Sequence, residues 1–106
     1  MRVLFDQGTP APLKQVLSGH EVSTAYELGW STLKNGELLA AAEANGFSVL
    51  VTTDGQLKCQ QNLASRTIAI VVLSTTSWPR IQASAPAIVG AVNTATPGSY
   101  AEVLVP

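Results

Sequence analysis

Charged side chains are scarce in this sequence. Asp, Glu, Lys and Arg make up 12% of its 106 residues, while hydrophobic residues make up 46%. The charged share is about half of that in an average globular domain. Because a surface with so little charge keeps a monomer in solution only weakly, we expect the chain to form a homo-oligomer or to bind a partner.

A basic excess is missing as well. The formal net charge is −1, whereas proteins that bind nucleic acid usually carry a clear surplus of Lys and Arg. The six basic residues are scattered along the chain. Any contact with RNA must therefore be local, or must use a metal ion to offset the phosphate charge.

Several other features are absent. Cys59 is the single cysteine, so an internal disulfide is excluded. No apolar run approaches the ~20 residues of a membrane-spanning helix, and the run at residues 3–5 is too short for a signal peptide. There is no glycine-rich phosphate loop and no Ser-His-Asp arrangement. These absences predict a cytoplasmic protein that does not enter a membrane.

Apolar runs alternate with segments of helical spacing along the whole chain. The predicted strands are residues 3–5, 21–25, 48–53, 68–73 and, at an edge, 100–105, and the predicted helices are 9–18, 37–45 with Asn35 as N-cap, 56–63 and 77–93. Pro86 should kink or divide the last helix. Continuous apolar runs suit strands that are buried on both faces of a parallel sheet.

This alternation predicts one α/β domain over residues 1–106. It should be a small three-layer sandwich with a mainly parallel sheet of four or five strands. Its crossovers should be right-handed, as nearly all such connections are.

The two aspartates of the chain each follow a predicted strand. Asp6 comes after the first, Asp54 comes after the third, and Glu37 lies in the first turn of the helix that leads into the third. Ligand sites of open parallel sheets lie at the carboxyl ends of the strands. A helix that enters from that edge would bring Glu37 close to both aspartates. Three such carboxylates suit Mg²⁺ or Mn²⁺, which can polarise a phosphoryl oxygen and activate water.

Each acidic residue also has a structural interpretation. Asp6 can make a turn ahead of Gly8, and Asp54 can cap a helix that begins near Gln56. Glu37 can stabilise its helix through the macrodipole.

The order of the motifs resembles a short bacterial PIN-like family. The matching segments are an apolar strand that enters an acidic motif at residues 3–10, a His-Glu-Val strand at 20–22, a polar turn with an acidic helix start at 34–39, Thr-Thr-Asp at 52–54 and an apolar strand at 68–73. The resemblance implies a PIN-like fold and an activity like that of the toxins of toxin–antitoxin pairs. Those toxins cleave RNA with Mg²⁺ held by acidic residues, so RNA and a small antitoxin protein are the implied partners.

The sequence departs from this family at several positions. Gln7 stands where the family often has Glu, Asn35 stands where it often has Asp, and Gly55-Gln56 replaces an acidic-aromatic pair. No acidic residue lies near Ser74 and Thr75, where a full nuclease has a fourth. These differences lower the expected metal affinity.

The departures keep two alternatives to a ribonuclease open. One is a catalytically inactive PIN-like binding module, and the other is a structural dimer with Trp30 or Trp78 in its interface. His20 could act as a general base, although a structural role is the simpler expectation. Cys59 is expected to be a packed thiol.

Overall fold

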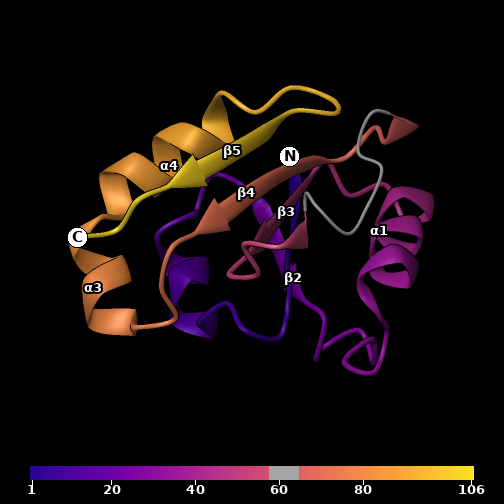
Figure 1. Ribbon diagram of the computed structural model, residues 1–106, viewed down its shortest axis with the longest axis horizontal. Coiled ribbons are helices and arrows are strands. Elements are labelled where there is room, and N and C mark those ends of the chain that lie inside the picture. The colour runs from indigo at the N-terminus through magenta and orange to yellow at the C-terminus, as the bar shows by residue number, and fades with distance from the viewer. Residues whose placement is uncertain (58–64) are drawn as a thin grey trace.

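Five parallel strands form a single sheet in the order β2-β1-β3-β4-β5 (Figure 1). The computed structural model describes residues 1–57 and 65–106. The strands are β1 (Arg2–Phe5), β2 (Glu21–Thr24), β3 (Val49–Thr52), β4 (Ala69–Leu73) and β5 (Tyr100–Val103). The predicted α/β class, parallel sheet and strand positions are therefore confirmed, with β5 at an edge. Most of the helix predicted at 56–63, including Cys59, lies outside the described residues.

The described helices are η1 (Ala11–Gln15), α1 (Asn35–Ala44), α3 (Trp78–Ala83) and α4 (Ala85–Asn93). The helix predicted at residues 9–18 is only the short 3-10 helix η1. The predicted division near Pro86 is confirmed, because α3 ends before Ser84 and α4 carries Pro86 in its first turn, where a missing N–H is tolerated. Within the described residues, no helix is both long and apolar enough to cross a bilayer.

Burial follows the strand order. Every residue of β3 and β4 is buried, whereas the edge strands β2 and β5 are largely half-exposed. Central strands with apolar side chains on both faces need a helical layer on each side. The continuous apolar runs of the sequence thus identify the middle of the sheet.

The two faces of the sheet have separate cores. Alternation places Phe5, Val51 and Val71 on one face, where they pack against the apolar side chains of η1, α3 and α4. Leu50 and Ile70 point to the other face and pack against Leu38, Leu39 and Ala42 of α1. The sheet therefore lies between two helical layers (Figure 1).

The crossovers do not all have the same hand. The β1–β2 connection runs toward one edge of the sheet and the β4–β5 connection toward the other, yet their helices cover the same face. Two such connections have opposite hands, so the expectation of uniformly right-handed crossovers is wrong. The short η1 leaves much of this face open, and α3 and α4 cover it. As a result α3 lies beside η1.

The two ends of α1 are defined by local interactions. The backbone N–H of Lys34 donates a hydrogen bond to Glu37 Oε1 at 3.2 Å, which is one half of a capping box. Gly46, with φ 78°, ends the helix in the left-handed conformation. The N-cap is Lys34, so the prediction that Asn35 is the N-cap is wrong by one residue.

Glu43 connects the end of α1 to the start of β4. Its carboxylate forms an ion pair with Arg66 at 2.7 Å and accepts hydrogen bonds from the backbone N–H groups of Thr67 and Ile68 at 2.6 and 3.3 Å. Burial acts to raise the pKa of Glu43, but the hydrogen bonds from Arg66, Thr67 and Ile68 together outweigh it and hold the pKa below its ordinary value. The charged form therefore stabilises the fold.

We expect Glu43→Ala to lower the free energy of unfolding at pH 7 by about 2 kcal/mol, the scale of hydrogen bonds to a charged group. A lowered pKa in the folded state contributes stability above the unfolded pKa and loses it as the pH falls through the folded pKa. The difference in unfolding free energy between wild type and variant should therefore shrink as the pH falls below 4.5, the ordinary pKa of a glutamate. Urea unfolding at pH 7 and pH 3.5, with the exposed Glu21→Ala as control, measures it. An equal difference at both pH values would contradict this role.

Candidate functional site at the ends of β1 and β3

The carboxyl ends of β1 and β3 lie side by side at a switch point of the sheet. The two strands are neighbours, but β1 connects to β2 on one side and β3 connects onward to β4 on the other. Such a point leaves a crevice above the strand ends, where ligands of open parallel sheets bind. Asp6 follows β1 directly, and Asp54 follows β3 by two residues.

A single hydroxyl connects the two aspartates. Thr52 Oγ1 donates a hydrogen bond to Asp6 Oδ2 and accepts one from the backbone N–H of Asp54 at 3.1 Å. The hydroxyl of Thr9 lies 2.7 Å from Asp6 Oδ1 and 2.9 Å from the carbonyl oxygen of Val51. Both oxygens of the Asp6 carboxylate therefore have a hydroxyl partner.

Thr9 and Thr52 are the buried polar residues of the part of the chain that the structure describes, at 6% and 1% exposure. Burying a hydroxyl costs free energy unless it is hydrogen-bonded. Here both hydroxyls contact the same carboxylate, which fixes the orientation of Asp6. A simple turn aspartate needs no such support.

The second carboxylate is held from a different element. Asn35, the first residue of α1, donates from Nδ2 to Asp54 Oδ2 at 2.9 Å, and the backbone N–H of Gln56 donates to Asp54 Oδ1 at 3.0 Å. The start of α1 therefore does lie at this edge of the sheet, as the sequence predicts. The side chain that reaches the site, however, is an amide.

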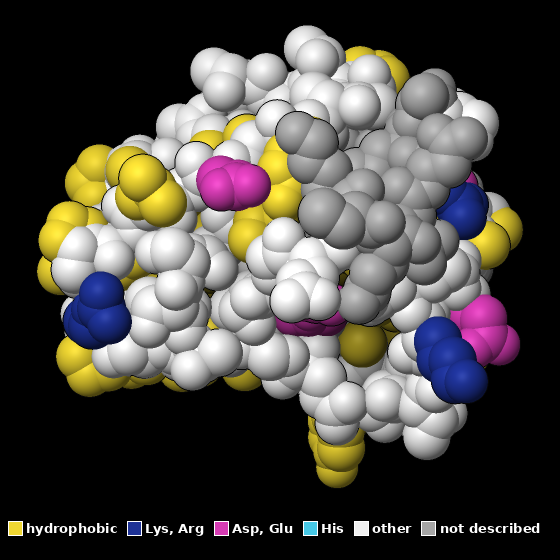
Figure 2. Space-filling view, viewed as in Figure 1, with side chains coloured by type: hydrophobic (Ala, Val, Ile, Leu, Met, Phe, Trp, Pro, Cys, Tyr) yellow, Lys and Arg dark blue, Asp and Glu magenta, His cyan; other side chains and the backbone are white. Residues whose placement is uncertain are grey.

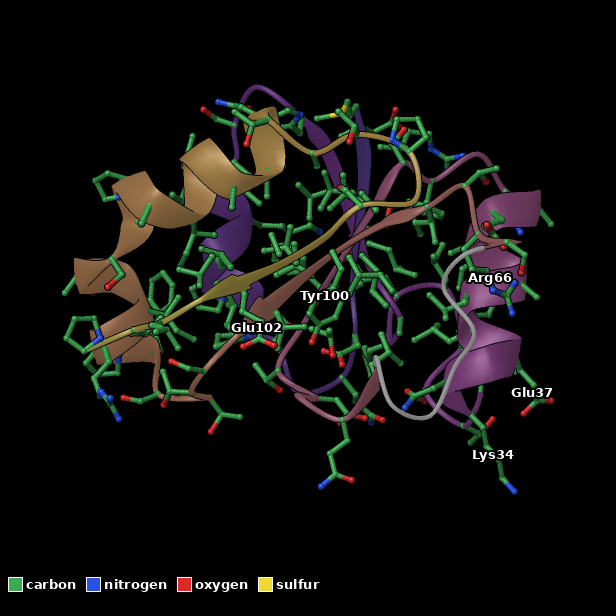
Figure 3. All side chains as sticks on the ribbon, turned by 45° about the horizontal axis from the view of Figure 1, so that its top comes forward. Lys34, Glu37, Arg66, Tyr100 and Glu102 are labelled. Carbon is green, nitrogen blue, oxygen red and sulfur yellow. The ribbon has the colours of Figure 1, made fainter. Side chains whose placement is uncertain are left out.

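Glu37 lies apart from the aspartates. It is exposed, its carboxylate accepts the hydrogen bond from Lys34, and it points outward from α1 (Figure 3). Residues two apart on a helix point about 200° away from each other, at 3.6 residues per turn. Since Asn35 faces Asp54, Glu37 faces solvent. Across residues 1–57 and 65–106, no three His, Cys, Asp or Glu side chains form a group that could hold a metal ion.

Gly8 allows the loops after β1 and β3 to approach closely. A Cβ at Gly8 would lie 2.5 Å from Thr53 Oγ1, well inside the contact distance of real atoms. The glycine therefore keeps the Asp6 turn against the loop that carries Asp54.

Another carboxylate, Glu102 of β5, faces the same side of the sheet. Its register partner on β4 is Val72, whose partner on β3 is Thr52, so at ~4.8 Å per strand Glu102 lies roughly 10 Å from Thr52 along the sheet. Glu102 accepts a hydrogen bond from Tyr100 at 3.2 Å (Figure 3) and lines a hollow of about 270 Å³ together with Thr53 and Ser74.

The remaining candidates have structural contacts. His20 lies between the N-terminal amine at 3.3 Å and Asn93 Oδ1 at 2.6 Å. Trp30 packs edge-on against Phe47, with ring centroids 6.1 Å apart. Ser74 accepts a hydrogen bond from the N–H of Val105 at 2.7 Å. Among the side chains that Figure 2 colours by type, the charged ones are scattered over this face and the Lys and Arg side chains form no cluster.

Sequence reasoning missed three members of the site: Thr9, Thr52 and Asn35. The Thr-Thr-Asp motif contains Thr52, and alternation along β3 places it on the face of Leu50, but its partner Asp6 follows another strand.

No protein-family model, curated protein or solved structure matches the chain.

We expect Thr52→Val to destabilise the fold by about 1–3 kcal/mol, because it leaves the N–H of Asp54 without its acceptor and removes a donor to Asp6. Thr53→Val, at the next and less buried position, should cost less than half as much. Urea unfolding of both variants measures this. A cost for Thr52→Val no larger than that for Thr53→Val would show that the bridge contributes nothing.

Proposed function

We propose that the chain is a PIN-like domain that binds Mg²⁺ or Mn²⁺ between Asp6 and Asp54 and hydrolyses phosphodiester bonds in RNA. The observation that carries this proposal is the hydroxyl of Thr52, which connects the Asp6 carboxylate to the backbone N–H of Asp54 at the switch point. Turn or cap roles account for each aspartate alone. They do not account for a buried hydroxyl that joins the side chain of one aspartate to the backbone of another, where the two aspartates follow separate strands.

The residues present fit a hard cation. Carboxylate and carbonyl oxygens are ligand types that suit Mg²⁺, and Mg²⁺ sites commonly use one or two carboxylates with water and phosphate as the other ligands. Asp6 and Asp54 would hold the ion, and Thr9 and Thr52 would orient Asp6. Rotation of the terminal amide of Asn35 would present a neutral oxygen.

When bound, the cation would polarise a phosphoryl oxygen and activate a water molecule. The chain contributes the orientation of the two carboxylates and the crevice above them. The cation would also offset the repulsion between these two carboxylates and the RNA phosphates, which the chain, with its net charge of −1, has no basic excess to offset. The resemblance to toxins of toxin–antitoxin pairs extends the proposal to a small antitoxin partner in the cytoplasm.

The test of the site is titration calorimetry with Mn²⁺, followed by an assay of Mg²⁺-dependent RNA cleavage. We expect one binding site in the wild type, and a loss of binding of at least tenfold, or about 1.4 kcal/mol, in both Asp6→Asn and Asp54→Asn. Cleavage should be lost in the same two variants. Glu37→Gln is the matched control, because it removes a carboxylate that lies away from the crevice.

Two outcomes would contradict this assignment. Equal Mn²⁺ affinity in wild type and Asp6→Asn would remove the metal site. A loss of binding in Glu37→Gln would show that Glu37 joins the site, as the sequence alone predicts.

A second candidate is an inactive PIN-like module that binds another protein or a second copy of itself. Asn35 favours it, because an amide occupies the place beside Asp54 where a third carboxylate would strengthen a cation site. Leu104, which is 80% exposed beside the edge strand β5, and the low charge support an interface between copies.

Asn35→Asp separates the two candidates. If the crevice binds a cation, a third carboxylate should raise the Mn²⁺ affinity on the order of tenfold. If it does not, the new charge repels Asp54 and only lowers the unfolding temperature. Asn45→Asp, at the other end of α1, adds the same charge away from the crevice and serves as the control.

A further inference from the structure

A groove of about 700 Å³ opens beside Asp6, which is within the range of small-ligand sites. It lies between the loop that follows β2, the segment that leads into η1, and the start of α3. Its lining includes Asp6 and Thr9 from the candidate site, Tyr26 and Trp78 as aromatic side chains, and Lys14 with Glu27 as a charged pair.

Tyr26 is an aromatic side chain that lies largely in solvent. It is 77% exposed, although most aromatic side chains of a small domain contribute to its core. Trp78, the first residue of α3, is partly buried against the core of the η1 face and also lines the groove. Two aromatic side chains therefore border one hollow, and flat rings with an exposed face are suited to stack on a nucleobase.

Lys14, which lines the groove, can exchange its partner Glu27 for a phosphate group of a ligand. Lys14 Nζ lies 2.7 Å from Glu27 Oε1, with side chains 35% and 49% exposed, and exposed pairs of this kind contribute only about 0–1 kcal/mol. Glu27 keeps a second donor, the N–H of Thr24 at 3.0 Å. Lys14 can therefore turn to a phosphate at little cost, while Glu27 stays in place.

We propose that this groove is a base-binding subsite, in which an unstacked nucleobase lies against Tyr26 and Trp78 while Lys14 contacts its phosphate. The proposal rests on the proposed function, since Asp6 lines both the groove and the candidate metal site. A base held there places the neighbouring phosphodiester at the ends of β1 and β3. The subsite excludes duplex RNA, because the base faces of a duplex are stacked.

Fluorescence anisotropy with a labelled single-stranded octamer in EDTA tests the subsite without cleavage. The wild type should bind the single strand more tightly than the same sequence in a duplex. Tyr26→Ala should weaken the single-strand affinity about tenfold, because one base stack contributes roughly 1–3 kcal/mol. Tyr26→Phe keeps the ring and should bind like the wild type, as should Leu28→Ala, a partly exposed neighbour outside the groove lining.

Wild-type affinity in Tyr26→Ala, equal binding of single strand and duplex, or no binding of either would overturn the subsite. These results are independent of the metal proposal, because EDTA removes the cation. Asp54→Asn that binds the octamer normally but cleaves nothing would leave both proposals standing. Cleavage by Tyr26→Ala with an unchanged KM would remove the subsite alone.

Discussion

The parallel pairing of β1 with β3 is the constraint on which the candidate site depends. In this register Phe5 lies opposite Val51, so the residues that follow, Asp6 and Thr52, lie at the same height along the two strands. The Thr52 hydroxyl can then reach the Asp6 carboxylate while it accepts the N–H of Asp54. A shift of one residue in either strand would turn Thr52 or Asp6 to the other face and separate them.

Buried polar groups are normally a cost that a small core avoids. Among residues 1–57 and 65–106, the buried polar side chains are those of Thr9 and Thr52. Both hydroxyls contact the carboxylate of Asp6, so each has a charged partner. Hydrogen bonds to a charged group are stronger than those between neutral groups. The arrangement therefore holds a negative charge at the end of a central strand, which is what a cation site requires.

The groove follows from a less common feature of the topology. Because the β4–β5 crossover runs over the same face as η1, the start of α3 lies near the loops that follow β1 and β2. Trp78 and Tyr26, 52 positions apart in the sequence, thereby line one hollow with Asp6. A crossover of the usual hand would place α3 and α4 on the face of α1, and the groove would then lack the wall that Trp78 forms.

Much of the fold could be predicted from the sequence, because burial on both faces of a central strand requires a continuous apolar run, and residues 49–52 and 69–73 have one. The position of Asp6 and Asp54 at the carboxyl ends of strands followed for the same local reason. Strand order, the hand of the last crossover and the rotation of α1 about its axis were set by tertiary packing. Leu38, Leu39 and Ala42 pack on the sheet, and this rotation turns Asn35 toward Asp54 and Glu37 toward solvent. Charge and spacing alone could not distinguish these two residues, because only the packed face of the helix decides which of them points inward.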